Sequence, residues 1–233
     1  MDDTKKKIKI KVKKKKINLK KILVLLLGLY LLYFLVSSIL KMPIKNIYVI
    51  GNNYLSDKEV LELAGIKDYP SYFLTTKRKM TKELLKNKYI KEVKIEKKFF
   101  WKVYLNISEY KVLALDKVTG KIILENGKKE ENTYNIRDIP ILLNEIDEKE
   151  YTKFIKAFSK VDSDILNQIS EIEYAPSNVD NKRFILYMND TNYVYISLDK
   201  IDKLNEYNKI KNDLEGKKGI LYLDSGNYFE IRK

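Results

Sequence analysis

The chain has 233 residues and carries 46 lysines and arginines against 32 aspartates and glutamates, a formal net charge of +14. It contains no cysteine and no histidine, which excludes disulfides, thiol chemistry, histidine-ligated zinc and a Ser-His-Asp triad. An enzymatic function would therefore depend on carboxylate, lysine, serine or tyrosine side chains.

An apolar run of nineteen residues without a charge, 22–40, follows a lysine-rich N-terminus. As a helix it would be about 28 Å long, close to the roughly 30 Å hydrocarbon core of a bilayer. We therefore expect a single transmembrane helix at 22–40. The preceding residues, 1–21, hold eleven lysines against Asp2 and Asp3. The positive-inside rule places this tail in the cytoplasm and everything after Lys41 outside it.

The apolar run has two other interpretations. A cleavable signal peptide would use Val36-Ser37-Ser38 as its small-residue cleavage site, but the run exceeds the usual apolar region of about 7–15 residues. A buried core helix is disfavoured because the run is apolar on every face. The lysine-rich tail could be a disordered segment that only sets the membrane topology, or it could adhere to anionic lipid. Nucleic-acid binding is a weaker alternative, because the tail has no aromatic residue to stack on bases.

Residues 43–110 predict five elements in the order strand, helix, helix, strand, strand. The first helix has the clearest signals, because Ser56 and Glu59 form a capping-box pair and Gly65 follows the apolar stripe. The second helix is expected at Met80–Asn87. The strands are expected at Ile44–Ile50, around Val93 and Ile95, and at Val103–Ile107, each apolar on one face. This pattern favours an antiparallel sheet covered on one side by two helices.

Five pieces of this region resemble a polypeptide-transport-associated (POTRA) domain. They are the strand ending in Gly51-Asn52, the helix entry Leu55-Ser56, the exit Ala64-Gly65-Ile66, the strand Tyr89–Ile95 and the last strand ending in Glu109. Placed directly after one N-terminal anchor, the region resembles the FtsQ/DivIB cell-division family. The resemblance implies an α+β fold, with a POTRA domain at 43–110 and an FtsQ/DivIB-type β domain at 111–233.

The sequence departs from this family between the last two POTRA strands. The family often has a proline in that turn, whereas this chain has Phe99-Phe100-Trp101. Beside Lys97, Lys98 and Lys102, the three aromatic residues could touch lipid headgroups or a partner. We expect instead that they fold back over the sheet.

Residues 111–233 predict a mainly antiparallel sheet with two helices. Asp147 and Glu150 repeat the capping-box pattern before an apolar helix face, and Asp199 begins a last helix that ends at Gly216. The expected strands lie at Val112–Leu115, Lys121–Leu124, Ile169–Tyr174, Phe184–Met188, Val194–Leu198, Gly219–Leu223 and Tyr228–Ile231. Ile139–Leu142 and the Asp224-Ser225-Gly226 turn are similar to elements of the family's second domain.

No arrangement of side chains predicts catalysis. The acidic group Glu145, Asp147, Glu148 and Glu150, and the pair Asp162 and Asp164, are typical of helix starts, where negative charge is favourable. Neither a G-x-S-x-G elbow nor a phosphate-binding glycine loop is present. We therefore predict a non-enzymatic protein with no catalytic residue, cofactor or metal site.

The family resemblance implies a divisome scaffold at the division septum that binds other single-span division proteins outside the cytoplasm. Those partners are FtsB/DivIC-like and FtsL-like coiled-coil proteins, and neither a nucleic acid nor a small-molecule substrate is expected. The partner-binding positions implied on this chain are Ile220, Tyr222, Leu223, Asp224, Ser225, Gly226, Tyr228 and Phe229. These residues could equally serve only to complete the sheet.

Two functions of other classes are alternatives to this scaffold. A POTRA-bearing transport or chaperone component would carry tandem copies or a membrane barrel, and neither pattern is visible. A membrane-tethered carboxylate hydrolase would need paired acidic residues that converge in a cleft, whereas the sequence shows only acidic residues at helix starts.

Overall fold

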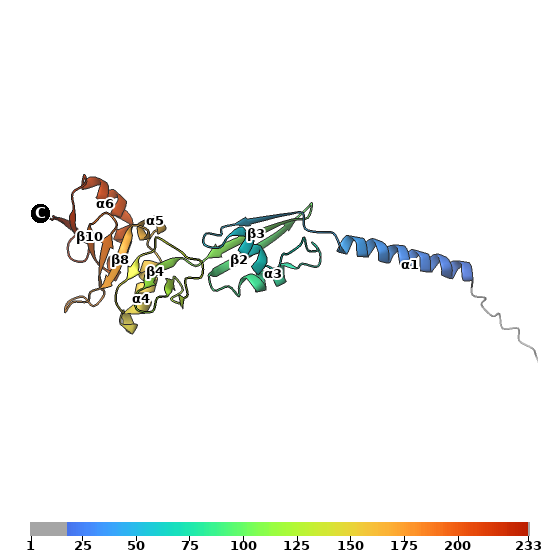
Figure 1. The fold of residues 1–233 in the computed structure, drawn as a ribbon, viewed down its shortest axis with the longest axis horizontal. Helices are drawn as coiled ribbons and strands as arrows, with labels where there is room; N and C mark the ends of the chain where they lie inside the picture. Colours follow the sequence, from blue (N-terminus) through green and yellow to red (C-terminus); the bar gives the residue numbers. More distant parts are fainter. Residues whose placement is uncertain (1–17, 233) are drawn as a thin grey trace, which may run out of the picture.

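The computed structural model describes residues 18–232, so most of the predicted tail, 1–17, lies outside the described residues. Its N-terminal helix, α1 (Leu19–Leu40), projects from the rest of the molecule and buries none of its residues (Figure 1). The helix begins three residues before the predicted start at Ile22, because Lys20 and Lys21 continue it. Among residues 18–232 it is the one helix long and apolar enough to cross a membrane.

Three strands and two helices follow α1 in the predicted order. They are β1 (Asn46–Ile50), α2 (Asp57–Leu63), α3 (Lys77–Leu84), β2 (Ile90–Lys98) and β3 (Lys102–Glu109). The sheet order is β1-β3-β2, with β2 and β3 antiparallel but β1 and β3 parallel. The expectation of an antiparallel sheet was wrong for β1. Alternating burial reports which face is covered and not which way a strand runs, and the connection through α2, α3 and β2 sets that direction.

The two helices of this first unit begin at capped residues. At α2 the predicted capping box is present: Ser56 Oγ accepts the Glu59 N–H at 3.3 Å, and the Glu59 carboxylate accepts the Ser56 N–H at 2.8 Å. Helix α3 begins at Lys77 and not at Met80, because the Thr76 side chain caps its first turn. Thr76 is a typical N-cap residue, so the start at Lys77 has a local signal in the sequence.

The turn between β2 and β3 contradicts the packing expected for its aromatic residues. Phe99 is 91% exposed and Phe100 is 75% exposed, while Trp101 is half-buried with the Lys45 amine 4.8 Å from its ring centroid. The last paired residues are Lys98 and Lys102, so the turn extends beyond the sheet and no strand lies beneath the two phenylalanines.

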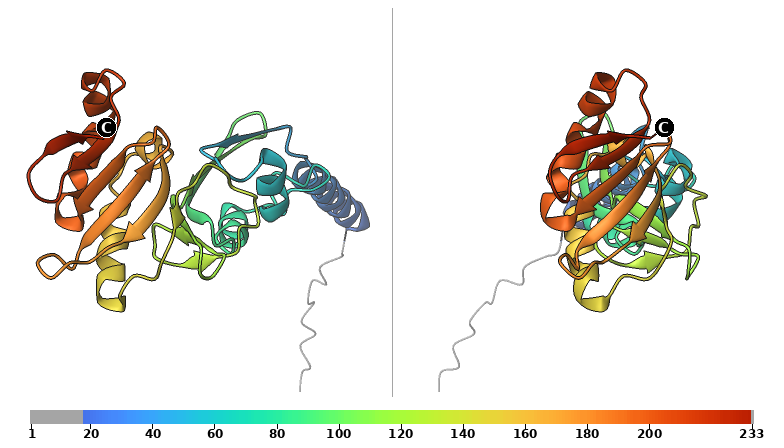
Figure 2. Two further views of the ribbon diagram at one scale, coloured as in Figure 1. Left: turned by 60° about the vertical axis from the view of Figure 1, so that its left-hand side comes forward. Right: turned by 90° about the vertical axis from the view of Figure 1, so that its left-hand side faces the viewer.

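Nine described strands form the second sheet (Figure 2). They are β4 (Val112–Asp116), β5 (Ile122–Leu124), β6 (Lys129–Glu130), β7 (Ile141–Leu142), β8 (Ile169–Tyr174), β9 (Arg183–Met188), β10 (Tyr193–Ser197), β11 (Gly219–Tyr222) and β12 (Tyr228–Ile231). Their spatial order is β12-β11-β10-β9-β8-β7-β4-β5-β6. Three neighbouring pairs, β4–β7, β7–β8 and β10–β11, are parallel, and the other five are antiparallel. The mainly antiparallel character is confirmed.

Helical segments cover one face of this second sheet. They are α4 (Glu148–Phe158), α5 (Ser163–Leu166), the 3-10 helix η1 (Leu198–Glu206) and α6 (Tyr207–Asp213). The last predicted helix is thus divided into η1 and α6, and Asp162 begins the short additional helix α5. Phe154 and Phe158 of α4 pack on Phe184 of β9, with ring centroids 5.5 and 6.0 Å away. All three side chains are fully buried, so the core lies between the helices and this face.

The hairpin of β4 and β5 contributes to both hydrophobic cores. Val112, Ile122 and Leu124 are buried in the core of the first unit, whereas Leu113 and Ile123 are buried in the core of the second. Adjacent residues of a strand point to opposite faces. One face of this hairpin therefore completes the first core, and the other face completes the second.

Candidate docking surface

Strand β12 lies at one outer edge of the nine-stranded sheet. Helices η1 and α6 return the chain from β10 so that β11 can pair with it in parallel, as such a pairing requires. Strand β12 then pairs antiparallel with β11. A Cβ atom at Gly219 would lie 1.9 Å from the Glu230 carbonyl oxygen, so glycine permits the close approach of the two strands.

The outward backbone groups of β12 follow from its ladder with β11. The Arg232 N–H donates to the Lys218 carbonyl oxygen at 2.9 Å. Because inward and outward groups alternate along a strand, the N–H groups of Phe229 and Ile231 point away from β11. No strand within residues 18–232 lies beyond β12. These groups are available to a strand from another chain.

A stack of tyrosine rings crosses the last three strands on the sheet face that the helices leave open. Tyr195 of β10 lies on Tyr222 of β11 with ring centroids 5.2 Å apart, and Tyr222 lies on Tyr228 of β12 at 4.6 Å. The Arg183 guanidinium lies 4.6 Å from the Tyr195 ring centroid. We call these four residues the tyrosine face. Stacked, half-exposed aromatic rings are typical of protein interfaces.

Hydroxyl groups beside this face remain protonated at neutral pH. The Tyr187 hydroxyl donates to Glu173 Oε2 at 2.6 Å, and this bond, together with burial, raises the pKa of Tyr187 to about 12. Burial first, and then the bond to Glu230, raises the pKa of Tyr222. The surface therefore presents neutral hydroxyl groups, which cost less to desolvate against a partner than charged ones.

The turn between β11 and β12 is held by cations from other elements. Asp224 Oδ2 accepts a hydrogen bond from Arg183 Nε at 3.0 Å, and its carbonyl oxygen accepts one from Lys200 Nζ at 2.5 Å. Lys203 Nζ donates to Asn227 Oδ1 at 2.8 Å. Asn227 has a φ of 58°, a conformation that asparagine tolerates in turns. The turn is thereby tied to η1 and β9.

The structure brings the eight predicted positions together at this edge but gives them different surroundings. Ile220, Tyr222 and Tyr228 lie on the open face, and Phe229 is half-buried against the core. Leu223 is only 3% exposed and belongs to the core, so it contributes to the sheet's packing. Asp224, Ser225 and Gly226 form the turn. Partner binding by this set stays a prediction.

Sequence reasoning missed the neighbours that complete the surface. They are Arg183, Tyr187, Tyr193, Tyr195 and Arg232, whose guanidinium lies 5.3 Å from the Tyr193 ring centroid. A signal was available in the segment YVYIS, where aromatic residues alternate with buried apolar ones. That alternation indicates a strand with an aromatic outer face.

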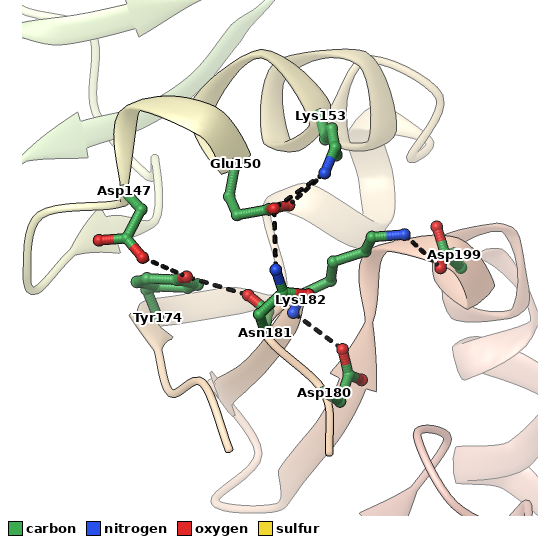
Figure 3. A network of polar contacts seen from close by, with 8 residues as sticks. All are labelled: Asp147, Glu150, Lys153, Tyr174, Asp180, Asn181, Lys182 and Asp199. Carbon is green, nitrogen blue, oxygen red and sulfur yellow. Dashed lines mark hydrogen bonds and ion pairs between the residues drawn. The ribbon is translucent and has the colours of Figure 1, made fainter. Parts of the chain in front are cut away.

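Two members of the acidic group at the start of α4, Asp147 and Glu150, make structural contacts (Figure 3). Glu150 is 3% exposed and bonds Lys153 Nζ at 2.8 Å and Asn181 Nδ2 at 3.1 Å. Asp147 Oδ2 lies 3.1 Å from the Tyr174 hydroxyl. The capping box predicted for α4 does not form, because both carboxylates have partners elsewhere in the fold. Among residues 18–232, no group of His, Cys, Asp or Glu side chains could hold a metal ion.

Comparisons with known proteins match both the first and the second unit. The family model "POTRA domain, FtsQ-type" matches residues 42–110, and the model "Cell division protein FtsQ/DivIB, C-terminal" matches residues 114–225. The cell division protein DivIB of Bacillus anthracis is 34% identical over 183 residues, covering 76% of this chain and 68% of that protein. DivIB of Bacillus subtilis is 32% identical over 178 residues, covering 73% and 67%.

The chain spans about two thirds of the length of the curated relatives it matches. A solved structure of the major extracytoplasmic domain of the trans isomer of DivIB from Geobacillus stearothermophilus is 26% identical. The match covers 46% of the present chain and 96% of the Geobacillus chain, with a TM-score of 0.39.

Proposed function

Because the chain belongs to the FtsQ/DivIB family of cell division proteins, we propose that it is a non-catalytic scaffold of the division machinery. In this role it binds other single-span division proteins outside the cytoplasm. The observation that carries the proposal is the open edge of β12, which lies beside the tyrosine face.

The proposed arrangement in the cell follows from charge and hydropathy. Residues 22–40 span the membrane, residues 1–21 lie in the cytoplasm, and the units at 43–110 and 111–233 lie outside it at the septum. The support is the lysine-rich sequence before the apolar run and the sparse positive charge just after it, at Lys41 and Lys45. A fluorescent fusion of the full chain should gather at mid-cell in dividing cells, and a uniform envelope signal would contradict the septal assignment.

The proposed mode of docking is addition of a partner strand to β12. An incoming strand would bond the outward N–H groups of Phe229 and Ile231, as in other strand-addition complexes. Its side chains would then meet the tyrosine face. The proposed partners are FtsB/DivIC-like and FtsL-like coiled-coil proteins.

A proline at Ile231 tests this mode most sharply. Ile231 is 56% exposed and its N–H points outward, so Ile231→Pro removes a donor to the partner without removing a bond to β11. The partner's carbonyl group would be left unsatisfied, at a cost of about 1–3 kcal/mol, or roughly a tenfold to hundredfold loss of affinity. Ile231→Ala is the matched control, because it trims the same side chain and keeps the N–H.

The measurement is affinity capture of a DivIC-like and FtsL-like complex by the full chain in detergent, with circular dichroism as the folding check. We expect Ile231→Ala to bind as the unaltered chain does and Ile231→Pro to bind much more weakly. Equal binding by both variants would refute strand addition at β12. A proline at Tyr222 is less informative, because β11 is bonded on both sides and the substitution would disrupt the sheet itself.

A further inference from the structure

The end of the first unit nearest α1 exposes a group of large apolar side chains. The loop between α2 and α3 and the turn between β2 and β3 both lie at the end of the small sheet that faces α1 (Figure 1). From these two segments, Tyr69, Phe73, Leu74, Phe99 and Phe100 are exposed. We call these five residues the membrane-proximal surface. An aromatic-lined groove includes Phe73, Phe99 and Phe100 and continues onto Trp101.

Hydrogen bonds to backbone carbonyl groups fix this surface close to the end of α1. The Ser71 hydroxyl donates to the carbonyl oxygen of Leu40, the last residue of α1, and the Tyr72 N–H donates to the Met42 carbonyl oxygen at 2.9 Å. The Lys45 N–H donates to the Trp101 carbonyl oxygen at 3.0 Å. Both segments are thus bonded to residues within five positions of the helix end.

The loop and the turn are also bonded to each other. The Tyr72 hydroxyl donates to the Lys98 carbonyl oxygen at 3.1 Å, and Lys97 Nζ donates to the carbonyl oxygens of Tyr72 and Thr75. Burial, with a smaller effect of Lys77, lowers the pKa of Lys97. Lys97 joins the two segments, and both segments are bonded to the residues at the end of α1.

The depth of this surface follows from the geometry of a membrane-spanning α1. The polar headgroup region adds roughly 5–8 Å on each side of the hydrocarbon core. Leu40 is the last residue of the apolar run and of α1, so in a membrane-spanning α1 it lies at the edge of the hydrocarbon core. A loop bonded to the Leu40 carbonyl group therefore begins at headgroup depth. Tyrosine and tryptophan rings are enriched at that depth, because they have an apolar body and a polar tip.

Charge around the surface complements an anionic membrane. The segments 67–79 and 97–102 contain seven lysines and arginines and a single acidic residue, Asp68. Lysines near an anionic lipid surface are attracted to it electrostatically. Exposed aromatic rings among basic residues are the combination that holds interfacial segments on membranes.

We infer that the membrane-proximal surface of the first unit rests in the anionic headgroup layer of the same bilayer that α1 crosses. The occupant of this apolar surface is lipid, and the contact gives the outer units a fixed tilt relative to the membrane. This inference rests on the membrane anchorage in the proposed function.

Trp101, the single tryptophan of the chain, provides the probe. The full chain is reconstituted into phosphatidylglycerol-containing vesicles whose acyl chains carry bromine, a fluorescence quencher, either near the headgroup or near the chain end. We expect the headgroup-proximal bromine to quench Trp101 strongly and the deep bromine to quench it weakly. Vesicles of phosphatidylcholine alone should give less quenching.

Substitution of the two exposed phenylalanines tests the contact. The double variant Phe99→Ser, Phe100→Asn should lose most of the quenching, and asparagine suits the positive φ of 64° at residue 100. Val179→Ser is the matched control, because Val179 is 97% exposed in the second unit and its loss should leave quenching unchanged.

Two results would overturn the inference. One is that bromine near the headgroup does not quench Trp101 while a water-soluble quencher does. The surface would then face water or a protein partner and not lipid. The other is quenching that the double variant leaves unchanged. Equal quenching in neutral and anionic vesicles would overturn the role of charge. Flotation with the vesicles after an alkaline wash tests the anchor separately, so failure of the anchorage is distinguished from failure of this contact.

Discussion

The first and second units should unfold as one, because they share the β4–β5 hairpin. Ile122 and Ile123 are consecutive in β5 and fully buried, the first in the core of the first unit and the second in the core of the other. Loosening either core loosens the strand that the other core requires. We therefore predict that Ile123→Ala destabilises the first unit as well as the second.

The expected size of the effect follows from the burial of Ile123. Truncating a fully buried isoleucine to alanine costs about 2–5 kcal/mol. With a urea dependence of about 2.5 kcal/mol per molar for a chain of this size, the midpoint should fall by about 1–2 M. Ile123→Val, which removes one methylene group, should cost only about 0.5–1.5 kcal/mol and is the matched control.

Two probes separate the units in a urea titration of the full chain in mild detergent. Trp101 fluorescence reports the first unit, which does not contain the substitution. Near-ultraviolet circular dichroism reports tyrosines, including the stack of Tyr195, Tyr222 and Tyr228 in the second unit. Both transitions of Ile123→Ala should shift together. A Trp101 transition at its original midpoint, with the tyrosine transition shifted, would refute the coupling.

Three further substitutions test local features. Burial and the bond to Asp147 raise the pKa of Tyr174 to about 12, so its contribution to stability is complete below pH 10. This contribution is lost as the pH rises toward 12, by about 2–3 kcal/mol; Tyr174→Phe should flatten that part of an alkaline unfolding curve, and an unchanged slope would contradict the assignment. Ser56→Ala should lower the free energy of unfolding by about 1 kcal/mol through loss of the α2 cap, and an unaltered melting temperature would argue against it. Gly51 has a φ of 85°, and a Cβ there would lie 2.3 Å from the Ile107 carbonyl oxygen. Gly51→Ala should therefore cost more than about 1 kcal/mol in thermal unfolding, and a variant as stable as the original chain would be inconsistent with this contact.

Local signals predicted much of this fold, whereas signals that depend on tertiary partners did not. The capping box of Ser56 and Glu59 is made by residues three apart and forms as expected. The same pattern at Asp147 and Glu150 fails, because Tyr174, Lys153 and Asn181 compete for the two carboxylates. A capping pattern thus predicts a helix start, but it predicts the side-chain bonds only where no other partner is in reach.

The candidate surface could be predicted only in part, because strand neighbours are set by the connections between strands. The sequence placed Tyr222 and Tyr228 on one hairpin, but Tyr195 joins them only through the η1–α6 crossover. The prediction that Phe99 and Phe100 pack over the sheet was wrong for a related reason. Alternation predicts which residues of a strand are buried, but it carries no information about a turn that extends past the end of the sheet.

Hydrogen exchange at β12 in the complex is the most direct test of the proposed scaffold. The account predicts that the amides of Phe229 and Ile231 exchange much more slowly once the full chain binds the proposed DivIC-like and FtsL-like partners. Exchange in the β2–β3 turn of the first unit should not change. A bound complex in which both β12 amides exchange as fast as in the free chain would contradict docking at this edge.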